Sequence, residues 1–240
     1  TKPFTIEFHF NAPQIANDNQ VILQKKSVDN GMTVFLSQTN DTSYADLYMI
    51  LSSGTVGLST YISGVEKGEF HHIAATFDRS SGPGGQIKLY KDAKLSASSS
   101  FASLGLINFA TASMTVGSGS AHSAGTAFSF TPVETLSGAL DDLRIWHKAK
   151  NQNEIRTQRF EEVFAQKDLQ LLMRFNEPSG SFSGNGSNLV LDYSGNGLHS
   201  SVENFSMGLR NTSSFGSSPV TEASRISTIS LFPSYSPITT

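Results

Sequence analysis

The sequence of 240 residues contains no cysteine and few charged residues, 15%, with a formal net charge of −3. The lack of cysteine excludes disulfides, thiolate metal sites and cysteine nucleophiles. The lack of a basic excess removes the electrostatic footprint of a nucleic-acid-binding protein. No apolar run approaches the length of a membrane span. The chain begins with Thr and shows no signal peptide, so we expect it to be processed or cut from something longer.

Short apolar or alternating runs, separated by turn residues, recur through the first 146 residues. In the clearest run, Phe4–Phe10, every second residue is Phe or Ile, so these side chains share one face of a strand. Many short strands at this spacing predict an all-β, antiparallel two-sheet sandwich or jelly roll. The further strands are predicted at 21–25, 32–36, 47–51, 56–62, 73–77, 87–90, 114–116 and 139–146.

One helix follows these strands. Asn151 suits an N-cap and Glu154 occupies the capping-box position three residues later. Apolar residues continue at helical spacing as far as Phe164, which predicts a helix over about 151–164. A strand is then expected at 169–175.

Two adjacent histidines, His71 and His72, precede Asp78 and a glycine-rich stretch. Neighbouring side chains on a strand point to opposite faces, so this pair cannot grip one metal ion together. The glycines are not followed by Lys-Ser/Thr or by a helix, as a phosphate-binding loop requires. We therefore expect a β-hairpin whose histidines are structural.

Several segments resemble, in order, the motifs of the laminin-G-like family of concanavalin-A-like jelly-roll domains. The pair FHHIAATFD and IKLYKDAKL is similar to W-H-H-V-A-x-T-Y-D followed by L-Y-x-D-G-x-L. The resemblance covers about residues 4–160 and implies a concanavalin-A-like jelly roll. Ala93 replaces the glycine that normally follows the hairpin aspartate, and because positive φ is costly for Ala we expect a different turn here. The other matching segments are FTIEFHF, ILQKKSVDNGMTVFL, MTVGSGS and LSGALDDLRIWHKAKNQNEI.

Two further segments, 171–180 and 190–202, resemble family motifs that normally precede the first strand. We therefore expect a laminin-G-like jelly roll over 1–165 and a C-terminal extension over 166–240. The extension either completes the jelly roll in permuted order or begins a second module. Its last part, 206–240, is rich in Ser, Thr and Pro and is predicted to be extended.

Carboxylates are the candidates for a metal site. Asp141 shares a face with Leu143 and Ile145 by alternation, so it is predicted to be a buried structural carboxylate, with calcium binding as the alternative. Family members sometimes bind calcium in rim loops. The resemblance therefore implies possible calcium ligands at Asp41, Asp46 and Asp78.

Catalysis is not expected. Glycoside hydrolases of this fold need two carboxylates on one concave face, and the glucanase pattern E-x-D-x-x-E is absent. Glu7 and Glu69 are isolated in the sequence and are expected to be solvated. A serine-hydrolase elbow, G-x-S-x-G, is also absent.

Binding remains. Jelly-roll lectins recognise sugars with aromatic rings and with Asn or Asp side chains. The candidates are Tyr44, Tyr48 and Tyr61, with Asn40 and Asp41 beside them; alternatively the tyrosines only complete the sheet surface.

Two functional classes follow from these observations. The first is a non-catalytic adhesion module of a larger surface or virion protein, which recognises a glycan or a cell-surface partner. The second is an architectural module that contacts neighbouring modules in an assembly such as a tailed-phage virion. A glycoside hydrolase is the remaining alternative. In the first two cases we expect an extracellular, cell-surface or virion location, and a homo-oligomer would be compatible with either.

Overall fold

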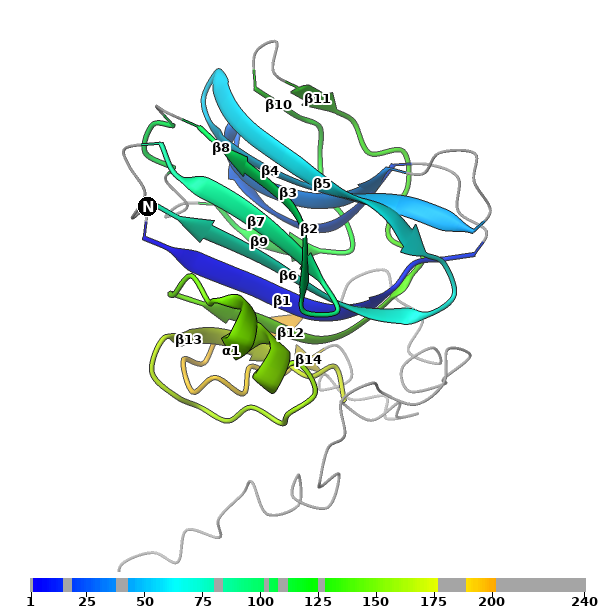
Figure 1. Ribbon diagram of the computed structural model, residues 1–240, viewed down its shortest axis with the longest axis vertical. Helices are drawn as coiled ribbons and strands as arrows, with labels where there is room; N and C mark the ends of the chain where they lie inside the picture. The colour runs from blue at the N-terminus through cyan, green and yellow to red at the C-terminus, as the bar shows by residue number, and fades with distance from the viewer. Residues whose placement is uncertain are drawn as a thin grey trace, which may run out of the picture.

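Most of the described strands form two antiparallel sheets that face each other across an apolar core (Figure 1). This computed structural model describes residues 2–14, 19–37, 43–79, 84–101, 104–107, 112–124, 128–176 and 189–201. The all-β jelly-roll prediction is confirmed.

The six-stranded sheet has the strand order β13-β12-β1-β6-β7-β8. Its first strand in the chain, β1, lies between β12 and β6 and pairs with both along its length. The bounds are β1 (Phe4–Asn11), β6 (Phe70–Asp78), β7 (Gln86–Lys91), β8 (Lys94–Ser100), β12 (Ala139–Trp146) and β13 (Leu169–Met173).

The five-stranded sheet has the order β5-β4-β3-β2-β9, so β5 forms one edge. A short hairpin of β10 and β11 lies on its outer face (Figure 1). The bounds are β2 (Gln20–Ser27), β3 (Asn30–Ser37), β4 (Tyr44–Ser53), β5 (Val56–Glu66), β9 (Met114–Val116), β10 (His122–Ala124) and β11 (Phe128–Phe130). The remaining elements are α1 (Gln152–Gln158), β14 (Leu189–Val190) and β15 (Ser200–Ser201).

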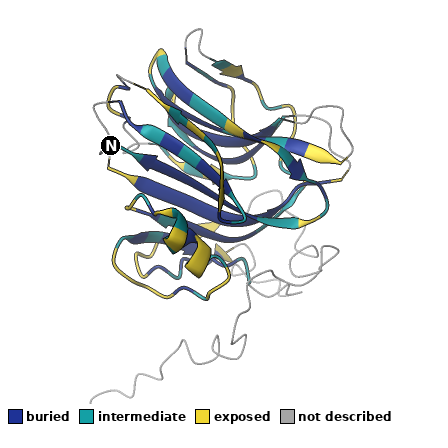
Figure 2. Ribbon diagram, viewed as in Figure 1, coloured by how far each residue is buried: buried dark blue, intermediate teal, exposed yellow. Residues whose placement is uncertain are grey.

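Strand β1 is buried on both faces (Figure 2). Its alternate residues Phe4, Ile6, Phe8 and Phe10 belong to the core between the sheets, as the alternation predicted. The opposite face is also buried, because α1 and the segment after it lie across the outer side of this sheet (Figure 1). The expectation that Glu7 is solvated is therefore wrong, whereas Glu69 is exposed as expected.

Helix α1 begins as predicted and ends early. Asn151 is the N-cap, and its side chain and that of Glu154 form the capping box. The helix ends at Gln158 rather than near 164 because the buried Arg144 guanidinium donates to the carbonyls of Gln158 (2.7 Å) and Glu161 (2.8 Å). These bonds satisfy oxygens that would otherwise accept from the next helical turn. Phe164, predicted to lie on the helix, is exposed.

The hairpin between β7 and β8 keeps the turn that Ala93 was expected to abolish. Asp92 and Ala93 have φ of 51° and 62° and connect the paired residues Lys91 and Lys94, as in a two-residue type I′ turn. Tertiary contacts hold this conformation. The Ala93 methyl group is buried against Ile155 of α1, and its carbonyl accepts a hydrogen bond from Gln152.

The face predicted for Asp141 is also wrong. A bulge in β12, where Asp142 has φ of 52°, places two residues opposite Phe8 of β1. Asp141 therefore pairs with His9 and lies on the outer face of the sheet rather than with Leu143. It is buried, at 9% exposure, as predicted.

The C-terminal extension contributes β13, which pairs with β12 at the edge of the six-stranded sheet. The carboxylate of Asp192 accepts bonds from the backbone N–H groups of Leu172, Ser194 and Leu198, which ties the following turn to β13. We therefore propose the permuted arrangement, in which this segment completes the jelly roll. The tail, 206–240, lies outside the described residues.

Candidate functional site

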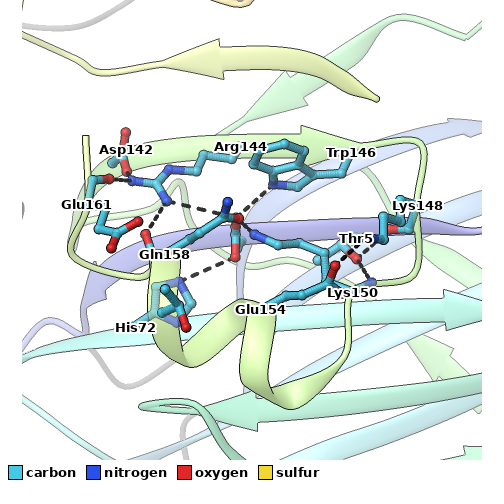
Figure 3. A network of polar contacts seen from close by, with 12 residues as sticks. Thr5, His72, Asp142, Arg144, Trp146, Lys148, Lys150, Glu154, Gln158 and Glu161 are labelled. Atoms are coloured by element: carbon cyan, nitrogen blue, oxygen red, sulfur yellow. Dashed lines mark hydrogen bonds and ion pairs between the residues drawn. The ribbon is translucent and has the colours of Figure 1, made fainter. Parts of the chain in front are cut away.

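A cluster of polar side chains is buried between the six-stranded sheet and α1. We call it the sealed layer; Figure 3 shows part of it between the helix and the strands of the sheet. Glu7 lies at its centre, where its Oε1 accepts from Trp146 Nε1 and from Lys150 Nζ, both at 2.7 Å. The layer comprises Glu7, His9, His72, Asp142, Arg144, Trp146 and Lys150.

Burial controls the protonation of the two histidines in this layer. It lowers the pKa of His72 to about 3, assisted by the positive charges of Arg144 and Lys150. Burial likewise lowers the pKa of His9 to about 3, with His72 and Arg144 adding to the effect. Both rings are therefore neutral near pH 7. The centroids of the two rings lie 5.0 Å apart.

The sealed layer has acid and base groups, but it is closed to a substrate. The side chains of Glu7 and Asp142, its two carboxylates, are 0% and 7% exposed. Lys150 and Arg144 pair with these carboxylates, so the charges are compensated inside the protein. The arrangement is that of a structural ion-pair network under a helix.

An open cleft of about 230 Å³ lies on the outer face of the five-stranded sheet, beside the β10–β11 hairpin. Tyr48 and Ile50 of β4 and Ser59 of β5 form part of its floor. The hairpin supplies Phe128, Ser129 and Phe130, and the complete lining adds Asn19, Phe35 and Ser37. Apolar rings thus lie beside amide and hydroxyl groups.

Four aromatic rings pack in a row across this face, and we call them the ring stack. The ring of Tyr48 lies 5.0 Å from that of Phe35 on β3 and 4.7 Å from that of Tyr61 on β5, with interplanar angles of 10° and 14°. Because β4 lies between β3 and β5, both faces of the Tyr48 ring are covered. Phe130 covers Phe35 in turn, at 3.8 Å. Tyr61, 47% exposed on the edge strand, therefore ends the stack.

His122 holds the hairpin against the sheet. Its Nδ1 lies 2.8 Å from Thr33 Oγ1 and its Nε2 lies 2.6 Å from Ser52 Oγ. The side chain is fully buried, and burial lowers its pKa to about 4. This contact fixes the strand that leads into the wall of the cleft.

The predicted binding residues separate into three groups. Tyr48 and Tyr61 come together in the ring stack, and Tyr48 lines the cleft. Tyr44 is exposed and lies on the same strand as Tyr48, four residues before it. Asn40 and Asp41 lie outside the described residues. Phe35 was not among the binding residues predicted from the sequence, although its position between inward-facing Val34 and Leu36 indicates that it lies on the outer face of the sheet.

Of the predicted metal ligands, the two that the structure describes, Asp46 and Asp78, are not brought together. Asp46 accepts a hydrogen bond from the backbone of Gly64 at 3.1 Å in one sheet, whereas Asp78 ends β6 in the other. Within the described residues, no group of three or more His, Cys, Asp or Glu side chains is placed to hold a metal ion. Because Asp41 is not described, calcium binding stays a prediction.

The two adjacent histidines face opposite ways, as predicted. His72 lies in the sealed layer, whereas His71 is near the start of β6, where its ring nitrogens contact Asp92 (2.8 Å) and Glu66 (3.1 Å). Each is held by its own neighbours. Among the described residues, no helix is long and apolar enough to cross a membrane.

Solved structures resemble this chain to different degrees. A candidate carbohydrate-binding protein from Bacteroides ovatus has a TM-score of 0.56 at 18% identity, over 84% of this chain and 54% of its own. The CBM40 domain of a Ruminococcus gnavus IT-sialidase, bound to α2,3-sialyllactose, has a TM-score of 0.48 at 14% identity, over 65% of this chain and 82% of its own. This chain thus spans about half the length of the Bacteroides ovatus protein.

The sequence comparisons identify the family. No curated protein matches the sequence. The family model described as the concanavalin A-like lectin/glucanases superfamily (Laminin_G_3) matches residues 1–156. Because this match covers more than half of the chain and the sheets have the expected architecture, the protein belongs to the laminin G-like branch of the concanavalin A-like lectin/glucanases superfamily.

Proposed function

We propose that this chain is a non-catalytic carbohydrate-binding module and that the cleft beside the β10–β11 hairpin is its binding site. The observation that carries the proposal is the composition of the cleft, in which aromatic rings lie beside uncharged hydrogen-bonding groups. A sugar ring presents apolar C–H faces and hydroxyl edges, so it needs both kinds of contact. Small-molecule sites combine them in the same way.

The ring stack assigns separate roles to the two tyrosines. Both faces of Tyr48 are covered, so it meets a ligand through its ring edge and hydroxyl group. Tyr61 ends the stack at the sheet edge and offers a ring face on which a sugar can lie. The proposed site therefore runs from the cleft to the edge of β5.

The absence of catalysis is part of the proposal. Glycoside hydrolysis needs two carboxylates that reach the sugar. None of the nine described residues that line the cleft is acidic. Glu7 and Asp142 lie across the molecule in the sealed layer and are paired with cations there. A surface or extracellular setting, as part of a larger protein, fits such a module.

The test is a glycan array probed with the complete chain, followed by calorimetry on the best ligand. Tyr61→Ala removes the proposed stacking face and is expected to weaken binding about tenfold or more, the loss expected when an aromatic residue that carries much of the binding energy is truncated. Ser59→Phe fills the cleft and is expected to abolish binding. Tyr44→Ala is the matched control, because Tyr44 is about as exposed as Tyr61 (45% and 47%) but is not one of the four rings that pack across the cleft face.

The proposal fails if the folded chain binds no glycan, or if Tyr61→Ala and Ser59→Phe bind as well as the parent. Repeating the array with calcium and with a chelator tests the remaining metal prediction. Calcium-dependent binding would direct attention to Asp41, Asp46 and Asp78.

A further inference from the structure

The cleft contains hydrogen-bonding groups but no ionic ones. None of the nine described lining residues carries a formal charge. Its polar groups are the Asn19 amide and the hydroxyls of Ser37, Tyr48, Ser59 and Ser129. Amides and hydroxyls both donate and accept, as sugar hydroxyls do. A carboxylate or sulfate group is held most strongly by Arg or Lys, which this lining lacks.

The charged residue next to the cleft on β4 is an aspartate. Asp46 lies two residues from Tyr48 on the same strand face and pairs with the cleft residue Ser37. Gly64 N donates to its Oδ1 at 3.1 Å, which fixes the carboxylate on this side of the sheet. Burial, and then the charge of Asp46, raise the pKa of the Tyr48 hydroxyl above its ordinary value. The negative field of Asp46 therefore reaches the cleft.

The cleft is small. Pockets for drug-sized ligands run from about 300 to 1,000 Å³, so a volume of about 230 Å³ suits a single sugar ring. The exposed face of Tyr61 beyond it could carry the next residue of a chain.

We propose that the cleft takes one uncharged hexose-type sugar ring and discriminates against sialylated or sulfated glycans. This inference rests on the proposed function and narrows it to one class of ligand. It follows from the uncharged lining, the neighbouring Asp46 and the size of the cleft.

The experiment compares matched glycans that differ only in one anionic group. The complete chain is titrated with neutral cores from an array, such as lactose, and with the 3′-sialyl and 3′-sulfo forms of each core. We expect each neutral form to bind about tenfold or more tightly than its anionic partner at low salt, with a smaller ratio at high salt because repulsion is screened. Equal or tighter binding of the anionic forms through the cleft would overturn the inference while leaving the proposed function standing.

Asp46→Asn tests the source of the discrimination. The amide oxygen can still accept from Gly64 N, so the fold should be retained. Affinity for the anionic member of a pair is expected to rise several-fold more than affinity for the neutral member, because the like charge is gone. An unchanged ratio would refute the contribution of Asp46. Failure of a folded chain to bind any glycan would instead refute the proposed function itself.

Discussion

The outer faces of the two sheets both carry aromatic and polar groups, yet they differ in charge and in access to solvent. On the six-stranded sheet, the sealed layer holds charged groups beneath α1, where they pair with one another. On the five-stranded sheet, the cleft holds uncharged groups that stay open to water. The difference indicates which polar cluster stabilises the fold and which one can exchange water for a ligand.

The physical reason lies in the cost of burying charge. An unpaired buried ion is destabilising by several kcal/mol, so Glu7, Lys150 and Arg144 must remain together once the helix covers them. Hydroxyl groups at an open cleft remain hydrated. They can exchange hydrogen bonds with water for hydrogen bonds with sugar hydroxyls at little net change in free energy. The following substitutions separate the two regions.

Glu7→Ala should have the largest effect, on stability alone. It removes the partner of Lys150 and the acceptor for Trp146 Nε1, leaving buried cations uncompensated. Breaking a buried pair in this way costs about 3–5 kcal/mol, a large share of the stability of a domain. Urea denaturation measures the loss, and glycan affinity of the folded fraction should remain unchanged. A loss below about 1 kcal/mol would show that the layer is hydrated rather than sealed.

Acid should weaken the protein through its buried histidines. Burial lowers the pKa of His9 and His72 to about 3 from 6.5, so between these values the unfolded state binds more protons. Stability is therefore complete above about pH 6.5 and falls as the pH drops, by up to about 1.4 kcal/mol per pH unit for each histidine. Urea denaturation between about pH 7 and 5 measures this slope.

His9→Phe isolates the contribution of the sealed layer to that slope. Neither ring nitrogen of His9 has a hydrogen-bond partner within the part of the chain that the structure describes, and the ring stacks on Phe160. A phenyl ring keeps a planar aromatic side chain and removes the titration, so the slope should decrease by up to about 1.4 kcal/mol per pH unit. An unchanged slope would assign the acid sensitivity to other groups, such as His122.

Asn151→Ala should loosen the helical cover by a smaller amount. Its side chain accepts from the backbone N–H groups of Asn153 and Glu154 at the start of α1. Loss of such a cap costs about 1 kcal/mol. Thermal unfolding would detect this, and hydrogen exchange should increase in α1 but not in β4 or β5. Increased exchange in both regions would show that the cover and the cleft unfold as one unit.

The parts of the fold that depend on residues close together in the chain were predictable from sequence. Alternation and turn residues placed β9 and β12, and the capping box placed the start of α1. The end of α1 was not predictable, because it is set by Arg144 on a strand. Alternation likewise assigned Glu7 to a face without showing that a helix covers it. In the cleft, Tyr48 and Tyr61 were identified by residue type, whereas Phe130 reaches the stack only through a hairpin far along the chain.

Ala93→Gly should have the smallest effect, because two changes oppose each other. Glycine relieves the left-handed conformation of a residue with φ of 62°, worth about 1 kcal/mol. It also removes a methyl group buried against Ile155, worth about 0.8 kcal/mol, and gives the unfolded chain more freedom. The net change in unfolding free energy should lie within about 1 kcal/mol of zero, slightly destabilising, with glycan affinity unchanged. A clear stabilisation would mean that contact with α1 does not hold this turn, and that the sealed layer depends less on its helical cover than its burial indicates.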